Sequence, residues 1–155
     1  MDIRTPASRM AAVAAAACVA LLSGCAAPAK REVRSTDRIY PAIGPYSQMV
    51  SHGGTLYFSG VLPLNAQGTA VAGATIEEQT RAVLDFIGAK LRSQGLGYED
   101  VLSTTVYMKD LGEFAAMNKV YAEYFKSQAP ARATVEVARL PRDVKIEISA
   151  IVGRR

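Results

Sequence analysis

The chain has 155 residues, of which 50% are hydrophobic and 21% are charged, so its composition excludes a wholly disordered protein and fits one domain with a short extension. A single histidine excludes sites that need several imidazoles, including the common catalytic zinc sets, and two cysteines exclude a disulfide-rich small fold. The formal net charge is +4, but residues 40–155 carry twelve basic and eleven acidic residues. The excess of positive charge therefore lies in residues 1–39, which argues against nucleic acid as a partner of the body.

The first 25 residues are typical of an export signal. Arg4 and Arg9 precede an uncharged run rich in Ala, Val and Leu, which ends at Leu22-Ser23-Gly24-Cys25. This tetrapeptide resembles the lipobox of bacterial lipoproteins, in which the cysteine thiol receives a diacylglyceryl group and becomes the new N-terminus. The resemblance implies lipidation at Cys25 and a protein attached to the cell envelope through its N-terminal lipid, on the periplasmic side. Ala26, in place of an acidic residue, favours the outer membrane.

An uncleaved transmembrane anchor is the alternative, because residues 10–29 carry no charge and are long enough to span a bilayer. Residues 26–38 are rich in Ala, Pro and charge, which predicts a flexible tether. The chain is thus expected to comprise a signal peptide (1–25), a tether (26–38) and one domain (39–155).

The first half of the domain predicts a hairpin and a helix. Residues 47–51 and 55–63 form apolar, β-branched runs joined by His52-Gly53-Gly54, a hairpin-type turn. Residues 64–74 are expected to form a loop. A helix begins at the capping box Thr75-Ile76-Glu77-Glu78 and ends near Gly95.

The second half predicts a strand, a helix and two strands. Residues 101–109 form the strand, and Asp110-Leu111-Gly112-Glu113 is interpreted as a second capping box. Its helix runs to about Lys126, and its expected inner side comprises Leu111, Phe114, Met117, Tyr121 and Phe125. Strands at 133–140 and 144–152 complete an α+β domain with the order β-β-α-β-α-β-β.

Two helices can cover only one face of such a sheet. Thr, Ser, Tyr and Val recur on both sides of the strands at 55–61 and 101–108, so the other face is half-apolar. We therefore expect self-association through that face, with a site between copies.

Two charged residues on the closing strands are candidates for chemistry. Arg132 lies where a strand begins, and its guanidinium can donate two parallel hydrogen bonds to a planar carboxylate. The plainer interpretation is a surface arginine at a strand end. Glu147 interrupts an apolar strand, opposite in phase to Ile146 and Ile148. If its face is an interface, Glu147 is a part-buried candidate general base; if that face is wet, Glu147 is only the polar side of the strand.

Three uncharged residues are weaker candidates. Tyr46 lies in a Gly-Pro turn that aims its phenol, but it also suits an aromatic plug at a sheet edge. Ser59 precedes Gly60 in a strand. Asn118 lies on an amphipathic helix, where it suits either a core-edge hydrogen bond or a ligand donor. We expect no catalytic triad, because the single histidine, His52, lies in a Gly-rich turn.

Together these segments resemble the Rid (reactive intermediate deaminase) family, RidA branch. The resemblance rests on residues 43–48, 58–60, 104–111, 118, 130–132 and 135–148. It implies a chorismate-mutase-like α+β fold and a homotrimer with sites between subunits. It also implies hydrolysis of 2-imino acids and their enamines, such as 2-aminoacrylate and 2-iminobutanoate, to a 2-keto acid and ammonia. No metal or organic cofactor and no nucleic acid is expected.

The resemblance also implies residue roles. Arg132 matches the arginine that pairs with the substrate carboxylate, and Glu147 the carboxylate that positions or activates water. Tyr46, Ser59 and Asn118 match pocket positions. The sequence departs from the family at Thr134, a substrate-binding position where cysteine is common, at Val61 in place of Gln, and in a segment 118–132 about three residues shorter than usual.

Two other functions remain open. One is a trimeric module that binds small carboxylates without imine deamination. The other is an endoribonuclease, a label that some family members carry; the near-neutral body, which lacks an arginine stripe with stacking aromatics, disfavours it.

Overall fold

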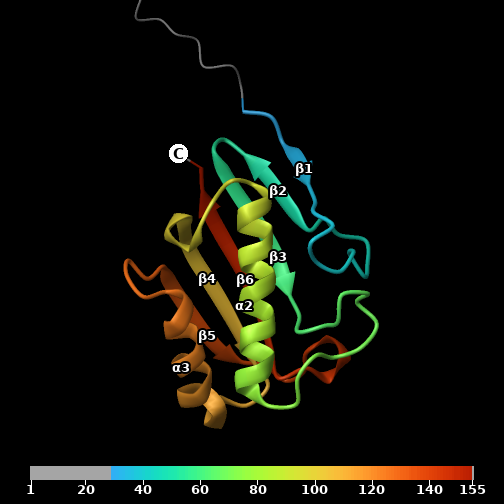
Figure 1. Cartoon of the computed structure of the whole chain (residues 1–155), viewed down its shortest axis with the longest axis vertical. Helices are drawn as coiled ribbons and strands as arrows, with labels where there is room; N and C mark the ends of the chain where they lie inside the picture. The colour runs from blue at the N-terminus through green and yellow to red at the C-terminus, as the bar shows by residue number, and fades with distance from the viewer. Residues whose placement is uncertain (1–28, 155) are drawn as a thin grey trace, which may run out of the picture.

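The computed structural model describes residues 29–154, in which two helices cover one face of a six-stranded sheet (Figure 1). The spatial order of the strands is β1-β2-β3-β6-β4-β5; only β4 and β5 run parallel. The strands are β1 (Glu32–Arg34), β2 (Met49–His52), β3 (Thr55–Val61), β4 (Val101–Met108), β5 (Ala131–Glu136) and β6 (Ile146–Gly153), and the helices α2 (Ile76–Ser93) and α3 (Phe114–Tyr124). The predicted signal peptide, with Cys25, lies outside the described residues. Within 29–154, no helix is long and apolar enough to cross a membrane.

The core lies between the sheet and the two helices. The residues of β2, β3, β4 and β6 that point toward the helices are buried, and the stripe of α2 predicted from its 3.6-residue period packs against them. This core includes Leu56, Phe58, Val83, Leu84, Ile87, Leu91, Val106, Met108, Met117, Ile146 and Ile148. Burial of each large side chain of this kind contributes about 1.5–3 kcal/mol.

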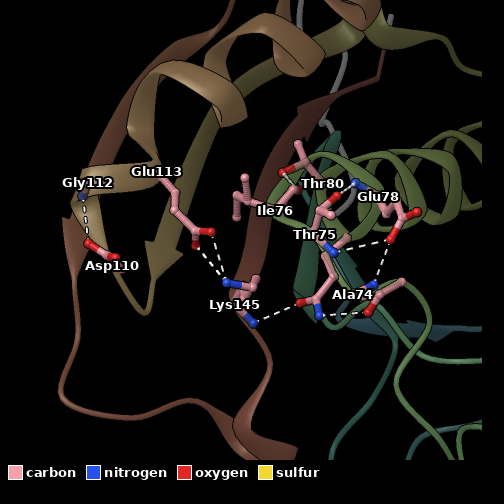
Figure 2. Close-up of polar contacts among 11 residues, drawn as sticks. Ala74, Thr75, Ile76, Glu78, Thr80, Asp110, Gly112, Glu113 and Lys145 are labelled. Atoms are coloured by element: carbon pink, nitrogen blue, oxygen red, sulfur yellow. Dashed lines mark hydrogen bonds and ion pairs between the residues drawn. The ribbon is translucent and has the colours of Figure 1, made fainter.

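The capping box at the start of α2 is present as predicted (Figure 2). The Thr75 hydroxyl accepts a hydrogen bond from the Glu78 N–H at 3.2 Å, and the Glu78 carboxylate accepts from the N–H groups of Ala74 and Thr75. These backbone donors hold the pKa of Glu78 below its usual value. At the other end of α2, Gly95 has a φ of +72°, the left-handed conformation that favours glycine.

The second predicted capping box is wrong. Asp110 accepts a hydrogen bond from the Gly112 N–H at 2.7 Å, and a short 3-10 turn precedes α3. The Glu113 carboxylate does not reach back to the cap; it binds the Lys145 ammonium at 2.9 Å (Figure 2). The Glu113 side chain, which the local pattern placed in a helix cap, therefore forms a tertiary ion pair instead.

The 3-10 turn also corrects the predicted inner side of the second helix. Leu111 and Phe114 are 40% and 38% exposed, whereas Met117, Tyr121 and Phe125 are buried as predicted. Leu111 lies in the 3-10 turn, which has three residues per turn and so does not continue the α-helical period, and Phe114 is the first residue of α3. The inner face starts one turn later than the pattern indicated.

Two strand predictions also need correction. The predicted tether contains β1, which pairs antiparallel with β2 through Glu32 with Ser51 and Arg34 with Met49. Residues 32–34 are too few and too charged to be predicted as a strand from sequence. They form one because the edge of β2 has unpaired backbone N–H and C=O groups. The strand expected at 133–140 is β5, residues 131–136, because its partner β4 ends at Met108, the residue paired with Glu136.

The face of the sheet away from the helices is half-apolar, as expected. Tyr57 on β3 and Ile151 on β6 are paired across the two strands and are 48% and 40% exposed. Val135 on β5 is exposed as well. Self-association through this face stays a prediction.

Candidate functional site

Arg132 lies on the outermost strand, β5, and points toward helix α3. Its strand partner is Thr104 on β4, which is buried on the helix side. The guanidinium carbon lies 4.6 Å from the centre of the Tyr121 ring and 5.8 Å from that of Phe114, within the range of cation–π attraction. Burial raises the pKa of Tyr121, whose hydroxyl shares a 2.8 Å hydrogen bond with the Thr104 hydroxyl. The aromatic rings thus hold the guanidinium in place.

The N–H groups of Arg132 remain available to a ligand. Within residues 29–154, no carboxylate forms an ion pair with Arg132. A pocket of about 520 Å³ opens beside it, and its lining residues are Asn118, Tyr121, Ala122, Phe125, Ala129, Pro130 and Arg132. The pocket therefore combines apolar lining residues with the cationic Arg132.

Two buried side-chain oxygens next to Arg132 lack hydrogen-bond partners. They are Oδ1 of Asn118, which lines the pocket, and Oγ1 of Thr134, two residues along β5 from Arg132 and on the same face of that strand. Buried polar groups in native proteins are nearly always paired, so unpaired ones at one place point to a missing ligand or water. We call Arg132, Asn118, Thr134 and Tyr121 the arginine half-site.

Glu147 lies on β6 and points to the uncovered face. Its neighbours Ile146 and Ile148 are fully buried on the helix side, so alternation places the carboxylate on the other face. Burial raises the pKa of Glu147. A Cβ added to Gly60 on β3 would overlap this carboxylate, lying 2.7 Å from its Cδ. The carboxylate therefore rests directly on the backbone of Gly60.

A β-bulge shapes β3 at this point. Phe58 pairs with Ala150 and Val61 pairs with Ile148, so Ser59 and Gly60 oppose a single residue of β6. The Ser59 hydroxyl donates to the Ser47 carbonyl at 2.6 Å and so ties the bulge to the segment that carries Tyr46.

Tyr46 is 41% exposed, and its hydroxyl accepts a hydrogen bond from the Ile43 N–H at 3.2 Å. Nearby, burial raises the pKa of Tyr40 to about 12, although the hydrogen bond that its hydroxyl accepts from the Leu62 N–H acts in the opposite direction. We call Glu147, Gly60, Ser59 and Tyr46 the carboxylate half-site.

The two half-sites lie on opposite faces of the sheet. Arg132 shares the helix side with its partner Thr104, whereas Glu147 is paired with Tyr107, three residues further along β4 and on the other face. One copy of the chain therefore cannot bring Arg132 and Glu147 into one crevice. Contact between the two groups requires a second copy.

The sequence did not predict the two residues that hold the charged side chains in place, Tyr121 beside Arg132 and Gly60 beside Glu147. Tyr121 was placed in the core, but its ring also carries the guanidinium; its position three residues after Asn118, on the same helix face, was an available signal. Gly60 within a strand is a sign of close approach to the backbone. His52 is exposed, as predicted, but it is the last residue of β2 and not part of the Gly-rich turn. Among the described residues, no three His, Cys, Asp or Glu side chains are grouped to hold a metal ion.

Comparisons with known proteins place the chain in a family. The profile of the family described as Endoribonuclease L-PSP matches residues 36–153. The 2-iminobutanoate/2-iminopropanoate deaminase of Escherichia coli K12 is 44% identical over 124 residues, covering 78% of this chain and 96% of that protein. The chloroplastic Reactive Intermediate Deaminase A of Arabidopsis thaliana is 40% identical over 132 residues, covering 85% of this chain and 71% of that protein.

A solved structure shares the fold. An E. coli protein crystallised with bound serine superposes with a TM-score of 0.75 at 38% identity, covering 80% of this chain and 99% of that one. The predicted α+β, chorismate-mutase-like fold is confirmed by this and related structures.

Proposed function

This chain belongs to the Rid family, the family described as Endoribonuclease L-PSP, and we propose that it hydrolyses small 2-imino acids and their enamine tautomers to 2-keto acids and ammonia. The observation that carries the proposal is the arginine half-site: an unpaired guanidinium on an aromatic support beside two unpartnered buried oxygens. The relative at 44% identity, named for 2-iminobutanoate and 2-iminopropanoate, supports this choice of substrate.

Arg132 binds the substrate carboxylate. Two parallel N–H···O hydrogen bonds from a guanidinium hold a planar carboxylate in one orientation. The side-chain oxygens of Asn118 and Thr134 are then in reach of the bound molecule, which satisfies groups that are otherwise unpaired. The apolar wall beside Ala122 and Phe125 accommodates a short hydrocarbon side chain.

Glu147 activates the attacking water. An imine carbon is already electrophilic, so orientation and one placed base suffice for hydrolysis. Water adds to C2 of the N-protonated imine and loses a proton to the Glu147 carboxylate, which gives a carbinolamine. Glu147 then returns that proton to the nitrogen. The C2–N bond breaks as the C2 hydroxyl loses its proton to solvent and becomes the keto oxygen, and ammonia leaves with the 2-keto acid behind.

The complete site is formed between copies, in a homotrimer. The opposite placement of Arg132 and Glu147 supports this arrangement, because each copy can supply one half-site to a neighbour on either side. The exposed apolar residues of the uncovered face, Tyr57, Ile151 and Val135, supply apolar area for association.

The test is keto acid release by the purified protein from 2-aminoacrylate generated in the assay. Arg132→Ala should lower the rate about a hundredfold, because the substrate loses its orientation. Arg31→Ala, an exposed arginine ahead of β1, is the matched control and should leave the rate unchanged. A rate no faster than background with the intact protein would reject the deaminase.

A small-carboxylate-binding module is the second candidate. The related structure with bound serine favours it, since serine carries the same carboxylate but no imine. Binding of pyruvate that is lost in Arg132→Ala, together with no deamination, is its expected signature.

Export and lipidation at Cys25 complete the proposal. The lipobox Leu22-Ser23-Gly24-Cys25 supports attachment to the periplasmic side of the cell envelope, in the outer membrane. Mass spectrometry of the chain expressed in bacteria should find a diacylated Cys25 as the first residue, and Cys25→Ser should abolish membrane attachment. A chain that keeps its first 24 residues contradicts this.

A further inference from the structure

A buried lysine lies directly behind the carboxylate half-site. Lys90, in the last turn of α2, is 2% exposed and lies beside the buried aliphatic side chains of Ile87 and Leu91 on the inner face of the helix. Its ammonium donates to the Gln48 carbonyl at 3.1 Å and to the Ser59 carbonyl at 3.4 Å. The ring of Phe58 lies 5.4 Å away. The proposed reaction makes no use of this group.

The two acceptors of Lys90 belong to the two segments that build the half-site. Gln48 follows the turn of Tyr46 and Ser47 and leads into β2, whereas Ser59 is the first residue of the β3 bulge. The Ser59 N–H also donates to the Gln48 carbonyl at 3.2 Å, so the ammonium lies where these segments meet. It contacts them from the helix side, while Glu147 lies on Gly60 from the other side.

The position is unfavourable for a charge. Within residues 29–154 no carboxylate is in ion-pair distance of Lys90, and the groups that face its Nζ are two backbone carbonyls and the Phe58 ring. Burial lowers the pKa of Lys90 to about 7. An aliphatic side chain would pack here without that penalty, so what the lysine adds is its two hydrogen bonds and its contact with the Phe58 ring.

We propose that Lys90 is a positioning residue, whose ammonium clamps the Gln48 and Ser59 carbonyls together and so holds the Ser59-Gly60 bulge in the shape that seats the Glu147 carboxylate. The clamp acts on Glu147 and Ser59 through the backbone and does not touch the substrate. Its link to catalysis rests on the proposed function, whereas its effect on the bulge does not.

The experiment compares Lys90→Met, which removes the donors at similar volume, with Lys126→Met, an exposed lysine after α3, as control. Three quantities are measured in the purified protein: the amide NMR signals of Ser59 and Gly60, the pKa of the Glu147 carboxyl by carbon-13 NMR, and kcat and KM for 2-aminoacrylate. Lys90→Met should shift both amides, move the Glu147 pKa and lower kcat about tenfold with KM within about twofold, since Arg132 lies in the other half-site. Lys126→Met should change none of them.

A folded Lys90→Met protein with unchanged bulge amides and an unchanged Glu147 pKa overturns the proposal. These two readouts need no deaminase activity, so an inactive wild type rejects the proposed function and leaves the clamp under test. If Lys90→Met does not fold, the wild-type protein is titrated instead. The Ser59 and Gly60 amides should then move with the midpoint of the Lys90 ammonium; amides that do not follow it overturn the clamp.

Discussion

The arginine and carboxylate half-sites are built on different principles. Around Arg132 the polar groups are left open: the guanidinium has no ion pair in the described chain, and oxygens of Asn118 and Thr134 lack partners. Around Glu147 the supporting groups are hydrogen-bonded to one another. The Ser59 hydroxyl donates to the Ser47 carbonyl, and Lys90 donates to two carbonyls. Gly60, which has no side chain, leaves room for the Glu147 carboxylate. The first half-site is suited to bind a ligand, and the second to hold one group still. In the proposed reaction, neither is complete alone.

The strongest test of this comparison mixes two inactive variants. Arg132→Ala and Glu147→Gln copies, each expected to be inactive alone, are co-expressed with different tags and purified as mixed assemblies. If each site takes its arginine from one copy and its glutamate from another, roughly a third of the sites in mixed trimers carry both native groups. Keto acid release should return to about that share of the wild-type rate.

Mixing the same variants after separate assembly is the control, and should restore nothing while copies do not exchange. Activity that stays at the level of the single variants in mixed assemblies, with native activity in co-expressed wild-type copies, would place both groups in one copy and break the division into half-sites.

The pH dependence of the rate tests the burial of Glu147. Burial raises the pKa of its carboxyl above the usual 4.5, and the base must be ionised, so kcat/KM should fall as the pH drops through this raised pKa. The acid limb of the rate profile should therefore lie above pH 4.5. A limb at or below the usual value would mean that Arg132 of a neighbouring copy outweighs burial.

The same raised pKa has a consequence for stability. A carboxyl whose pKa is higher in the folded than in the unfolded state stabilises the fold below its unfolded pKa, and this contribution is lost as the pH rises through the folded pKa. Glu147→Gln should therefore be more stable than wild type at pH 8 and lose that advantage at pH 4. Urea unfolding at both pH values measures this, with Glu99→Gln as an exposed control.

Gly60→Ala tests the close approach on which Glu147 rests. The added methyl group would overlap the carboxylate, so we expect a loss of about 1–3 kcal/mol in the free energy of unfolding and a lower kcat. Gly153→Ala, on β6 with only ordinary contacts to Leu102, should be nearly neutral. Equal stability of the two variants in thermal unfolding would contradict the close approach.

The smallest expected change in stability comes from removing the hydroxyl of Thr134, which has no hydrogen-bond partner, or that of Thr104, which has one. Thr134→Val removes a buried hydroxyl without a partner and should stabilise the ligand-free protein by about 1 kcal/mol, while it weakens pyruvate binding several-fold. Thr104→Val removes a hydroxyl bonded to Tyr121 and should destabilise by about the same amount. If both variants change the free energy of unfolding in urea in the same direction, the two hydroxyls do not differ as the structure indicates.

Local patterns predicted most of the fold, because they depend on neighbours in the chain. The period of α2, its capping box at Thr75 and its terminal Gly95 need no distant partner, and all three are present. The alternation of β6 likewise placed Glu147 opposite to Ile146 and Ile148. The same local logic was wrong for Glu113, where Lys145, 32 residues away, binds the carboxylate.

The amino-acid sequence by itself therefore determined most of the elements, the buried stripe of α2 and the identity of the residues that match the family motif. Only the tertiary structure decided that Arg132 and Glu147 face away from each other, that 32–34 form an edge strand, and that Lys90 lies behind the bulge at Ser59 and Gly60. The physical reason is the distance along the chain over which each effect acts. Periodicity and capping depend on residues a few positions apart, whereas strand register and the surroundings of a buried charge depend on which distant segments pair.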